Sequence, residues 1–272
     1  MKNEITCCNC VEGMQKLPEE SVDFVITSPP YDDLRDYKGY TFDHEDVMSG
    51  IFKVLKKGGV LVWVVADATH KGSETGTSFK QALYAKEIGF NIHDTMIYFR
   101  NAVTNPSKIR YYNCFQYMFV FSKGRPKTIN LIRDKKNKTA GKKAYNRQQR
   151  EKDGGLHERK NYGNKGVGRP EYSVRWNIWK YNVGSLIMAD DRLWRDHPAV
   201  YPLKLAEDHI VSWTNEGDVV MDPMCGSGQS CIAAKKLGRD YIGMDISEDY
   251  CKIARKRLDL DIYKDPRINE EI

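Results

Sequence analysis

The chain lacks several features that would place it in a familiar class. No stretch of its 272 residues is apolar and long enough to cross a membrane; the longest apolar run lies between Gly59 and Ala68. The first residues lead straight into a strand-like segment without the pattern of a signal peptide, so we expect a cytoplasmic protein. The seven cysteines are odd in number and irregularly spaced, which argues against a disulfide framework. The cluster at Cys7–Cys10 has no second pair at a spacing suited to zinc, so we predict no metal site.

Positive charge is concentrated in one part of the chain. The segment Lys123–Lys180 contains 18 lysines and arginines but only five acids, so its net charge is +13 in a chain whose net charge is +6. The remainder therefore carries −7. A basic segment in an otherwise acidic chain indicates contact with a nucleic acid. The alternative is a solvated loop without a partner.

Apolar periodicity predicts an α/β protein interrupted by an insert. Strands are expected at residues 4–10, 22–27, 60–65, 90–99, 114–122, 218–221 and 241–244. We expect the segments 90–99 and 114–122 to form an antiparallel pair at the sheet edge. Helices are expected at residues 44–55, 78–88, 201–213, 229–237 and 248–258. Regular α/β spacing is absent between residues 123 and 195, which predicts three parts: 1–122, the insert 123–195, and 196–272.

A stiff elbow follows the predicted strand 22–27. Pro29 and Pro30 each fix their own φ, and each restricts the preceding residue to extended geometry. Ser28 and the carbonyl of Pro29 should therefore lie on a rigid corner at a strand end, followed by the flat ring of Tyr31. Such a corner suits a planar group that carries an amine, although an ordinary surface loop would give the same pattern.

The C-terminal part reads as strand, glycine turn, helix, strand and acid. Gly226 and Gly228 allow backbone to approach a ligand closely at a helix N-terminus. Asp245 follows Asp222 at the spacing of nucleotide-binding folds and suits a ribose diol. The turn lacks the third glycine of the dinucleotide fingerprint and the Gly-Lys-Ser/Thr of a phosphate-binding loop. A nucleoside without pyrophosphate fits better, which makes S-adenosylmethionine the expected cofactor.

Together, the segments Thr27–Tyr31 and Asp222–Gly228 resemble the motifs of exocyclic-amino DNA methyltransferases. The order of catalytic motif, basic insert and cofactor motif resembles the permuted β group. The lead-in Leu17–Asp23 and the element His197–Pro202 are also similar to that group. The resemblance implies a Rossmann-like methyltransferase with a mixed seven-stranded sheet, a catalytic part (1–122), an inserted basic target-recognition region (123–195) and a cofactor-binding part (196–272).

The resemblance also assigns a cofactor site to the chain. By motif position it comprises Asn9, Thr27, Pro198, Asp222, Pro223, Met224, Gly226, Ser227, Gly228 and Asp245. The sequence departs from the group at three places. Asn9 stands where an aspartate is common, and Met224 and Gln229 stand where phenylalanine and threonine are usual.

The chemistry implied is direct methyl transfer to an amine of a flipped base, with Ser28, Pro29, Pro30 and Tyr31 as the catalytic residues. Ser28 Oγ and the Pro29 carbonyl would accept the two amine hydrogens, and Tyr31 would stack on the base, which must leave the duplex. Methylation at cytosine C5 would need a thiolate nucleophile, which that family presents in a Pro-Cys dipeptide that this chain lacks. By resemblance, serine at position 28 favours cytosine N4, with adenine N6 as the alternative.

The expected partner is double-stranded DNA, bound through the basic insert. Candidate base-reading residues are Arg169, Arg175, Asn177 and Lys180, held by Trp176 and Trp179, for which a local core is the alternative role. A cognate restriction endonuclease could accompany the chain, which would act as a monomer or homodimer. Competing interpretations are methylation of RNA or of a protein glutamine, and a non-catalytic DNA-binding protein.

Overall fold

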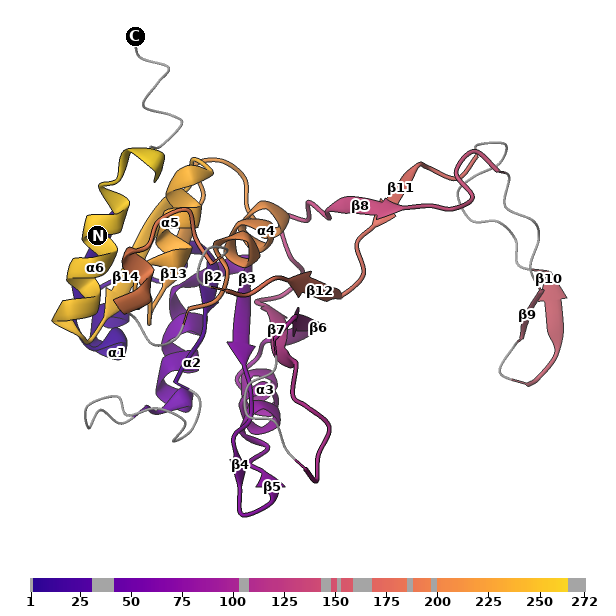
Figure 1. The fold of residues 1–272 in the computed structure, drawn as a ribbon, viewed down its shortest axis with the longest axis horizontal. Coiled ribbons are helices and arrows are strands. Elements are labelled where there is room, and N and C mark those ends of the chain that lie inside the picture. Colours follow the sequence, from indigo (N-terminus) through magenta and orange to yellow (C-terminus); the bar gives the residue numbers. More distant parts are fainter. Residues whose placement is uncertain are drawn as a thin grey trace, which may run out of the picture. The chain divides into compact units, whose positions relative to one another are not determined.

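The computed structural model describes residues 2–30, 42–102, 108–142, 148–150, 153–158, 168–184, 188–196 and 200–263. The chain forms two compact units (Figure 1). Unit 1 comprises Met1–Asn130 and Asn177–Ile272, and unit 2 comprises Leu131–Trp176. Unit 2 lies within the expected insert, whose flanking residues 123–130 and 177–195 belong to unit 1. Within the described ranges, no helix is both long and apolar enough to span a membrane.

Unit 1 is built on one eight-stranded sheet. Its order is β1 (Glu4–Cys7), β14 (Asp240–Asp245), β13 (Val219–Asp222), β2 (Val22–Thr27), β3 (Leu55–Val65), β7 (Phe115–Ser122), β6 (Asn91–Arg100) and β12 (Ile178–Tyr181). All neighbouring pairs are parallel except those made by β7, which runs antiparallel to both β3 and β6. The predicted mixed α/β fold is therefore confirmed.

The sheet has one strand more than the sequence predicted. β12 alternates exposed and buried residues, and its Trp179 and Tyr181 are 7% and 8% exposed. Burial of these two aromatic rings favours pairing of β12 with β6. The antiparallel pair β6–β7 was predicted correctly, but β12 rather than β6 forms the edge of the sheet.

Helices cover both faces of the sheet (Figure 1). In Figure 1, α1 (Cys10–Gln15), α2 (His44–Val54) and α3 (Thr77–Glu87) lie on one side, and α4 (Leu203–Trp213), α5 (Gln229–Lys236) and α6 (Glu248–Leu258) lie on the other. Successive residues of strand β14 face opposite sides of the sheet. Its Met244 packs against Gly13 of α1, whereas a Cβ added at Gly243 would come within 2.8 Å of Cys231 Sγ on α5.

The expected strand at residues 4–10 is wrong in its second half. Asn9 accepts a hydrogen bond from the backbone N–H of Val11 at 2.8 Å and caps α1, so that Cys10 begins a helix and β1 ends at Cys7. A capping side chain satisfies one of the free N–H groups at a helix start, which favours the helix over a longer strand.

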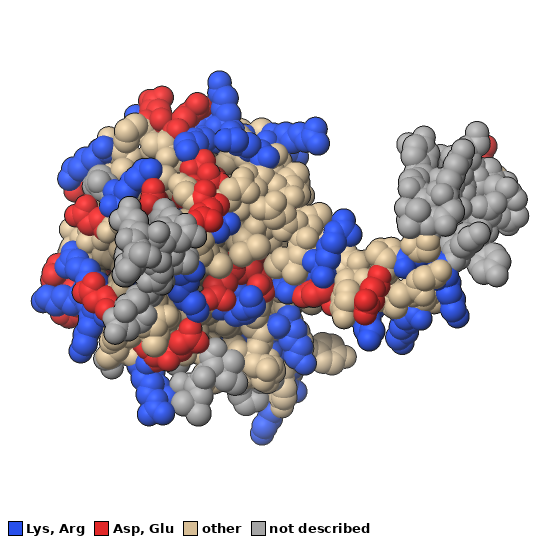
Figure 2. All heavy atoms as spheres, turned by 90° about the horizontal axis from the view of Figure 1, so that it is seen from above, with Lys and Arg blue, Asp and Glu red and all other residues tan. Residues whose placement is uncertain are grey.

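The remaining short elements are divided between unit 1 and unit 2. Unit 1 also contains the short hairpin β4 (Thr69–His70) and β5 (Ser73–Glu74) and the 3-10 turns η1 (Leu193–Asp196) and η2 (Asp261–Tyr263). Unit 2 consists of two antiparallel pairs, β8 (Arg133–Lys136) with β11 (Tyr172–Val174) and β9 (Gln148–Arg150) with β10 (Leu156–Glu158). Figure 2 shows lysine and arginine side chains gathered along unit 2.

Candidate active site

The candidate site lies where the carboxyl ends of four parallel strands meet. β13 lies between β2 and β14, so Asp222 at its end lies beside Thr27 on one side and near Asp245 on the other. β1 follows β14, with Cys7 opposite Asp245. The two sequence motifs, far apart in the chain, thus become neighbours at the middle of the sheet. This is the edge at which open α/β sheets bind ligands.

The proline elbow starts from a fully buried strand end. Thr27 is opposite Trp63 of β3 and is fully buried. Pro29 is buried as well, while Ser28 and Pro30 are half-buried. Because sheet pairing and burial fix the start of the elbow, Ser28 and the Pro29 backbone have little freedom to move. Tyr31, the fourth predicted catalytic residue, lies outside the described residues.

Asp222 is a buried carboxyl with several donors around it. Its carboxylate accepts hydrogen bonds from the backbone N–H of Met224 at 3.1 Å and from the hydroxyl of Ser230, and Tyr201 lies at 3.5 Å. Burial raises the pKa of Asp222 to about 6, although the Ser230 and Thr27 hydroxyls oppose this shift. At neutral pH the site therefore holds a carboxylate that is poorly solvated.

The glycine turn is held to the adjacent strand by backbone contacts. The N–H of Cys225 donates to the carbonyl of Met244 at 2.8 Å, and the N–H of Gly226 donates to the Asp245 carboxylate at 2.9 Å. Gly228 has a φ of 83°, and a Cβ there would lie 2.9 Å from the Cβ of Ala254. Only glycine satisfies both conditions, which explains why the predicted turn contains it.

Asp245 and Asn9 lie at neighbouring strand ends. The N–H of Cys8 donates to the backbone carbonyl of Asp245 at 2.9 Å, and the N–H of Ser247 donates to its carboxylate at 2.9 Å. Desolvation raises the pKa of Asp245 above its ordinary value, against the effect of its backbone donors. Asn9 uses its Oδ1 to cap α1. The structure thus brings together the predicted residues at the ends of β1, β2, β13 and β14, whereas Pro198 lies outside the described residues.

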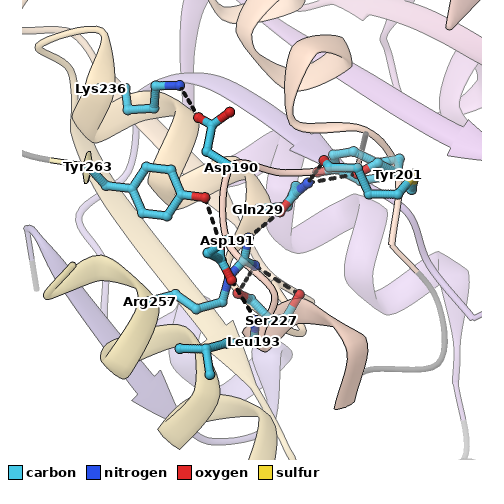
Figure 3. A network of polar contacts seen from close by, with 10 residues as sticks. Asp190, Asp191, Leu193, Tyr201, Ser227, Gln229, Lys236, Arg257 and Tyr263 are labelled. Atoms are coloured by element: carbon cyan, nitrogen blue, oxygen red, sulfur yellow. Dashed lines mark hydrogen bonds and ion pairs between the residues drawn. The ribbon is translucent and has the colours of Figure 1, made fainter. Parts of the chain in front are cut away.

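A buried network behind the turn was not predicted from the sequence (Figure 3). Arg257 of α6 is fully buried; its guanidinium donates to the Ser227 carbonyl at 2.6 Å, to Gln229 Oε1 at 2.8 Å and to the Asp191 carboxylate at 2.9 Å. Tyr263 donates to the same carboxylate at 2.6 Å. The signal for this network is a buried arginine close to a nucleotide-type turn. That signal depends on the position of α6, which the sequence alone does not give.

The Asp191 carboxyl in this network is ionised at neutral pH. Burial alone would raise the pKa of Asp191, but hydrogen bonds from Arg257 and Tyr263 outweigh burial and hold the pKa below its ordinary value. Burial and Asp191 raise the pKa of the Tyr263 phenol. Among the described side chains, no group of three or more His, Cys, Asp or Glu residues is arranged to hold a metal ion.

The four predicted DNA-reading side chains all make contacts within the free protein. In unit 2, Arg175 Nε donates to Asp134 at 2.8 Å, and Arg169 donates to Thr139 Oγ1 at 2.6 Å. In unit 1, the Asn177 amide donates to the backbone carbonyl of Thr95 at 3.2 Å, and the Lys180 ammonium lies 5.9 Å from the ring centre of Phe99. These contacts hold the side chains in the free protein and would have to be exchanged if the side chains read bases.

The two tryptophans of this region differ. Trp179 is buried and its ring centre lies 4.4 Å from that of His209, so it belongs to the core of unit 1. Trp176 is 66% exposed, and the Lys135 ammonium lies 3.3 Å from its ring centre. The local-core interpretation is therefore correct for Trp179 and wrong for Trp176.

The residues at the strand ends fit S-adenosylmethionine. The turn Asp222–Gly228 contains no lysine or arginine, which suits a ligand without phosphate groups. The carboxylates of Asp222 and Asp245 suit a ribose diol and a cationic sulfonium. A mixed, largely parallel sheet with this turn and acid at the ends of its central strands defines the class of Rossmann-like methyltransferases.

The chain belongs to the N6/N4 DNA methyltransferase family, whose model, described as DNA methylase, matches residues 22–256. The orphan methyltransferase M.BamHII of Bacillus amyloliquefaciens is 52% identical over 241 residues, which is 88% of this chain and 89% of that protein. Family membership confirms methyltransferase activity on DNA and S-adenosylmethionine as the methyl donor.

Solved structures share the fold. The PvuII DNA methyltransferase, described as cytosine-N4-specific, aligns with a TM-score of 0.68 and 20% identity over 99% of this chain and 91% of its own. The complex of M1.HpyAVI with S-adenosylmethionine aligns with a TM-score of 0.58 and 22% identity over 94% of this chain and 99% of its own.

Proposed function

We propose that this DNA methyltransferase modifies the exocyclic N4 of cytosine in double-stranded DNA. The observation that carries the proposal is a serine at the start of the elbow, on the rigid end of β2, beside the strand that carries the cofactor turn. The PvuII enzyme, which shares the fold over nearly the whole chain, is described as cytosine-N4-specific and supports the choice of base.

The elbow would act by gripping the amine rather than by attacking the base. The lone pair of an aromatic amine is delocalised into its ring, so the nitrogen is a weak nucleophile. Ser28 Oγ and the Pro29 carbonyl would accept its two N–H groups and draw the nitrogen towards tetrahedral geometry. Pro30 would keep the corner rigid, and Tyr31 would stack on the flipped ring. The bound cofactor supplies an electrophilic methyl group.

The cofactor would lie across the ends of β13, β14 and β1. The glycine turn, Gly226–Gly228, would allow close approach of the ligand, and Asp245 would bind the ribose. Asn9 and Met224 would flank the adenine. Thr27, Pro198, Asp222, Pro223 and Ser227 complete the proposed site; Asp222 and Ser227 are already fixed by hydrogen bonds from Ser230 and Arg257.

Unit 2 would supply the sequence-independent part of DNA binding. Arg133, Lys136 and Lys138 are exposed on or next to β8, and neutralising phosphates with such side chains is strongly salt-dependent. Trp176 offers an exposed aromatic face beside the Lys135 ammonium, a combination suited to stacking on a nucleotide. Arg169, Arg175, Asn177 and Lys180 remain the proposed base-reading residues.

The test is mass spectrometry of nucleosides from plasmid DNA incubated with the protein and S-adenosylmethionine. N4-methylcytosine is the expected product. N6-methyladenine would retain the family and the elbow but show that Ser28 does not select the base. The absence of any methylated deoxynucleoside, with cofactor binding intact, would favour an RNA or protein-glutamine substrate or a non-catalytic role.

The restriction endonuclease partner and the oligomeric state are separate questions from the choice of base. The relative from Bacillus amyloliquefaciens is named an orphan methyltransferase, which favours action without a cognate restriction endonuclease. Size-exclusion chromatography with light scattering decides between the proposed monomer and homodimer.

A further inference from the structure

The side chain of Gln229 joins the start of α5 to two residues that precede the cofactor turn in the chain. It is 3% exposed and stands at the first position of α5, directly after Gly228. Its Nε2 donates to the carbonyl of Met188 at 2.7 Å and to the carbonyl of Tyr201 at 3.0 Å. One amide group therefore holds Met188, which precedes the predicted element His197–Pro202, and Tyr201, which lies within it.

Arg257 fixes the orientation of that amide. A guanidinium can only donate hydrogen bonds, so the Gln229 oxygen must face Arg257 and the NH2 group must face the two carbonyls. The same guanidinium donates to the Ser227 carbonyl at 2.6 Å and to Ser227 Oγ at 3.1 Å. Asp191 neutralises its charge, with N and O atoms 2.8 Å apart. Gln229, Arg257 and Ser227 are buried, so water competes little for the contacts among them.

We propose that Gln229 and Arg257 are positioning residues for S-adenosylmethionine, which act by locking Met188 and Tyr201 to the cofactor turn. The inference rests on the proposed cofactor site. Neither side chain needs to touch the cofactor. Their contacts hold Ser227 of the turn and the carbonyls of Met188 and Tyr201 in one arrangement before the ligand arrives, which lowers the entropic cost of binding.

The proposal also explains a departure from the related methyltransferases. The resemblance implies threonine at position 229, and a threonine side chain is too short to reach Arg257 and both carbonyls. Tyr201 strengthens the same connection from the other side, because its hydroxyl lies 2.7 Å from Ser230 Oγ on α5. Met188 and Tyr201 are thus joined to α5, which directly follows the turn, by contacts that this chain makes through its glutamine.

The sharpest variant is Gln229→Glu, which has nearly the same shape and keeps an acceptor for Arg257 but removes both N–H donors. Gln229→Met removes all three contacts at similar volume. Titration calorimetry with S-adenosylmethionine should show the Kd raised about tenfold or more in both variants, the loss expected for one to two buried hydrogen bonds. At saturating cofactor, kcat should stay within about threefold of wild type, because the elbow is untouched.

Gln81→Met is the matched control. Gln81 is 2% exposed and accepts a hydrogen bond from Trp63 Nε1 at 2.9 Å, so its replacement also breaks a buried amide contact. Its Kd should remain within about twofold of wild type at a comparable loss of Tm. A wild-type Kd in Gln229→Glu, or equal increases in the Gln229 and Gln81 variants, would overturn the proposal.

The variant Asp245→Ala distinguishes a failure of the proposed positioning role from a failure of the proposed cofactor site. This variant removes the proposed ribose ligand and should lose measurable cofactor binding. If it binds S-adenosylmethionine as tightly as wild type, the proposed site is wrong and the inference falls with it. If it loses binding while Gln229→Glu and Gln229→Met do not, the site stands and only the positioning role is refuted.

Discussion

The stability of an Asp222→Asn variant relative to the wild-type, cofactor-free protein should rise between acidic and neutral pH. Burial raises the pKa of the native carboxyl to about 6 from its ordinary value of 3.8. A carboxyl with a raised native pKa favours folding while it is protonated, and this contribution is lost as pH rises through the native pKa. Asparagine cannot ionise and keeps an acceptor for the N–H of Met224, so the variant escapes this loss.

The size of the effect follows from the two pKa values. A difference of about two units corresponds to about 3 kcal/mol of unfolding free energy once pH is well above 6, of which about 2 kcal/mol develops between pH 4.5 and pH 7.5. The rearranged hydrogen bonds of Asp222→Asn change its stability by a similar amount at both pH values. Its stability relative to wild type should therefore improve by about 2 kcal/mol across this interval.

Urea unfolding of both proteins at pH 4.5 and pH 7.5 measures this difference directly. Asp191→Asn is the control. Because the pKa of Asp191 lies below its ordinary value of 3.8, its contribution is already present at pH 4.5, and the variant should lose similar stability at both pH values. A change of less than about 0.5 kcal/mol for Asp222→Asn, or one of opposite sign, would refute the argument.

Ser28→Ala should reduce methyl transfer by about 100-fold or more while the Kd for S-adenosylmethionine stays near wild type; retained turnover in a radiolabel assay would remove the proposed elbow chemistry. Trp176→Ala should weaken DNA binding by about 1–3 kcal/mol, and Lys135→Ala should lower the slope of log K against log salt by about one; a flat salt response would argue against unit 2 as the phosphate-binding surface. Arg257→Met should cost about 3–5 kcal/mol in urea unfolding because it leaves Asp191 charged and buried, and a loss below about 1 kcal/mol would contradict this.

Local sequence patterns predicted most of the fold because each pattern reports a local cause. The run Val60–Val65 is apolar throughout since this strand is covered on both faces. The helix at Glu248–Leu258 was predicted with its observed bounds, since Ser247 can cap it and basic residues occupy its last turn. The elbow at Ser28 and the turn at Gly226–Gly228 were recognisable because proline restricts the backbone, whereas glycine readily adopts the positive φ that a tight turn requires.

What the sequence could not predict depends on residues that are distant in the chain. The strand β12 forms because Trp179 and Tyr181 become buried when it pairs with β6. A four-residue alternating pattern within a basic segment does not predict pairing with a distant strand. The exposed position of Trp176, only three residues earlier, was likewise decided by its surroundings and not by its type.

The sequence by itself determined the α/β fold class, the elbow, the glycine turn and the family, because these depend on backbone preferences and on short motifs. Only the tertiary structure placed β13 between β2 and β14, which brings Asp222 beside Thr27. It also buries Arg257 with Asp191 and places the Gln229 amide where it donates hydrogen bonds to both Met188 and Tyr201. A charge or an amide acquires such a role only when burial removes water and distant segments supply its partners, and no local pattern contains that information.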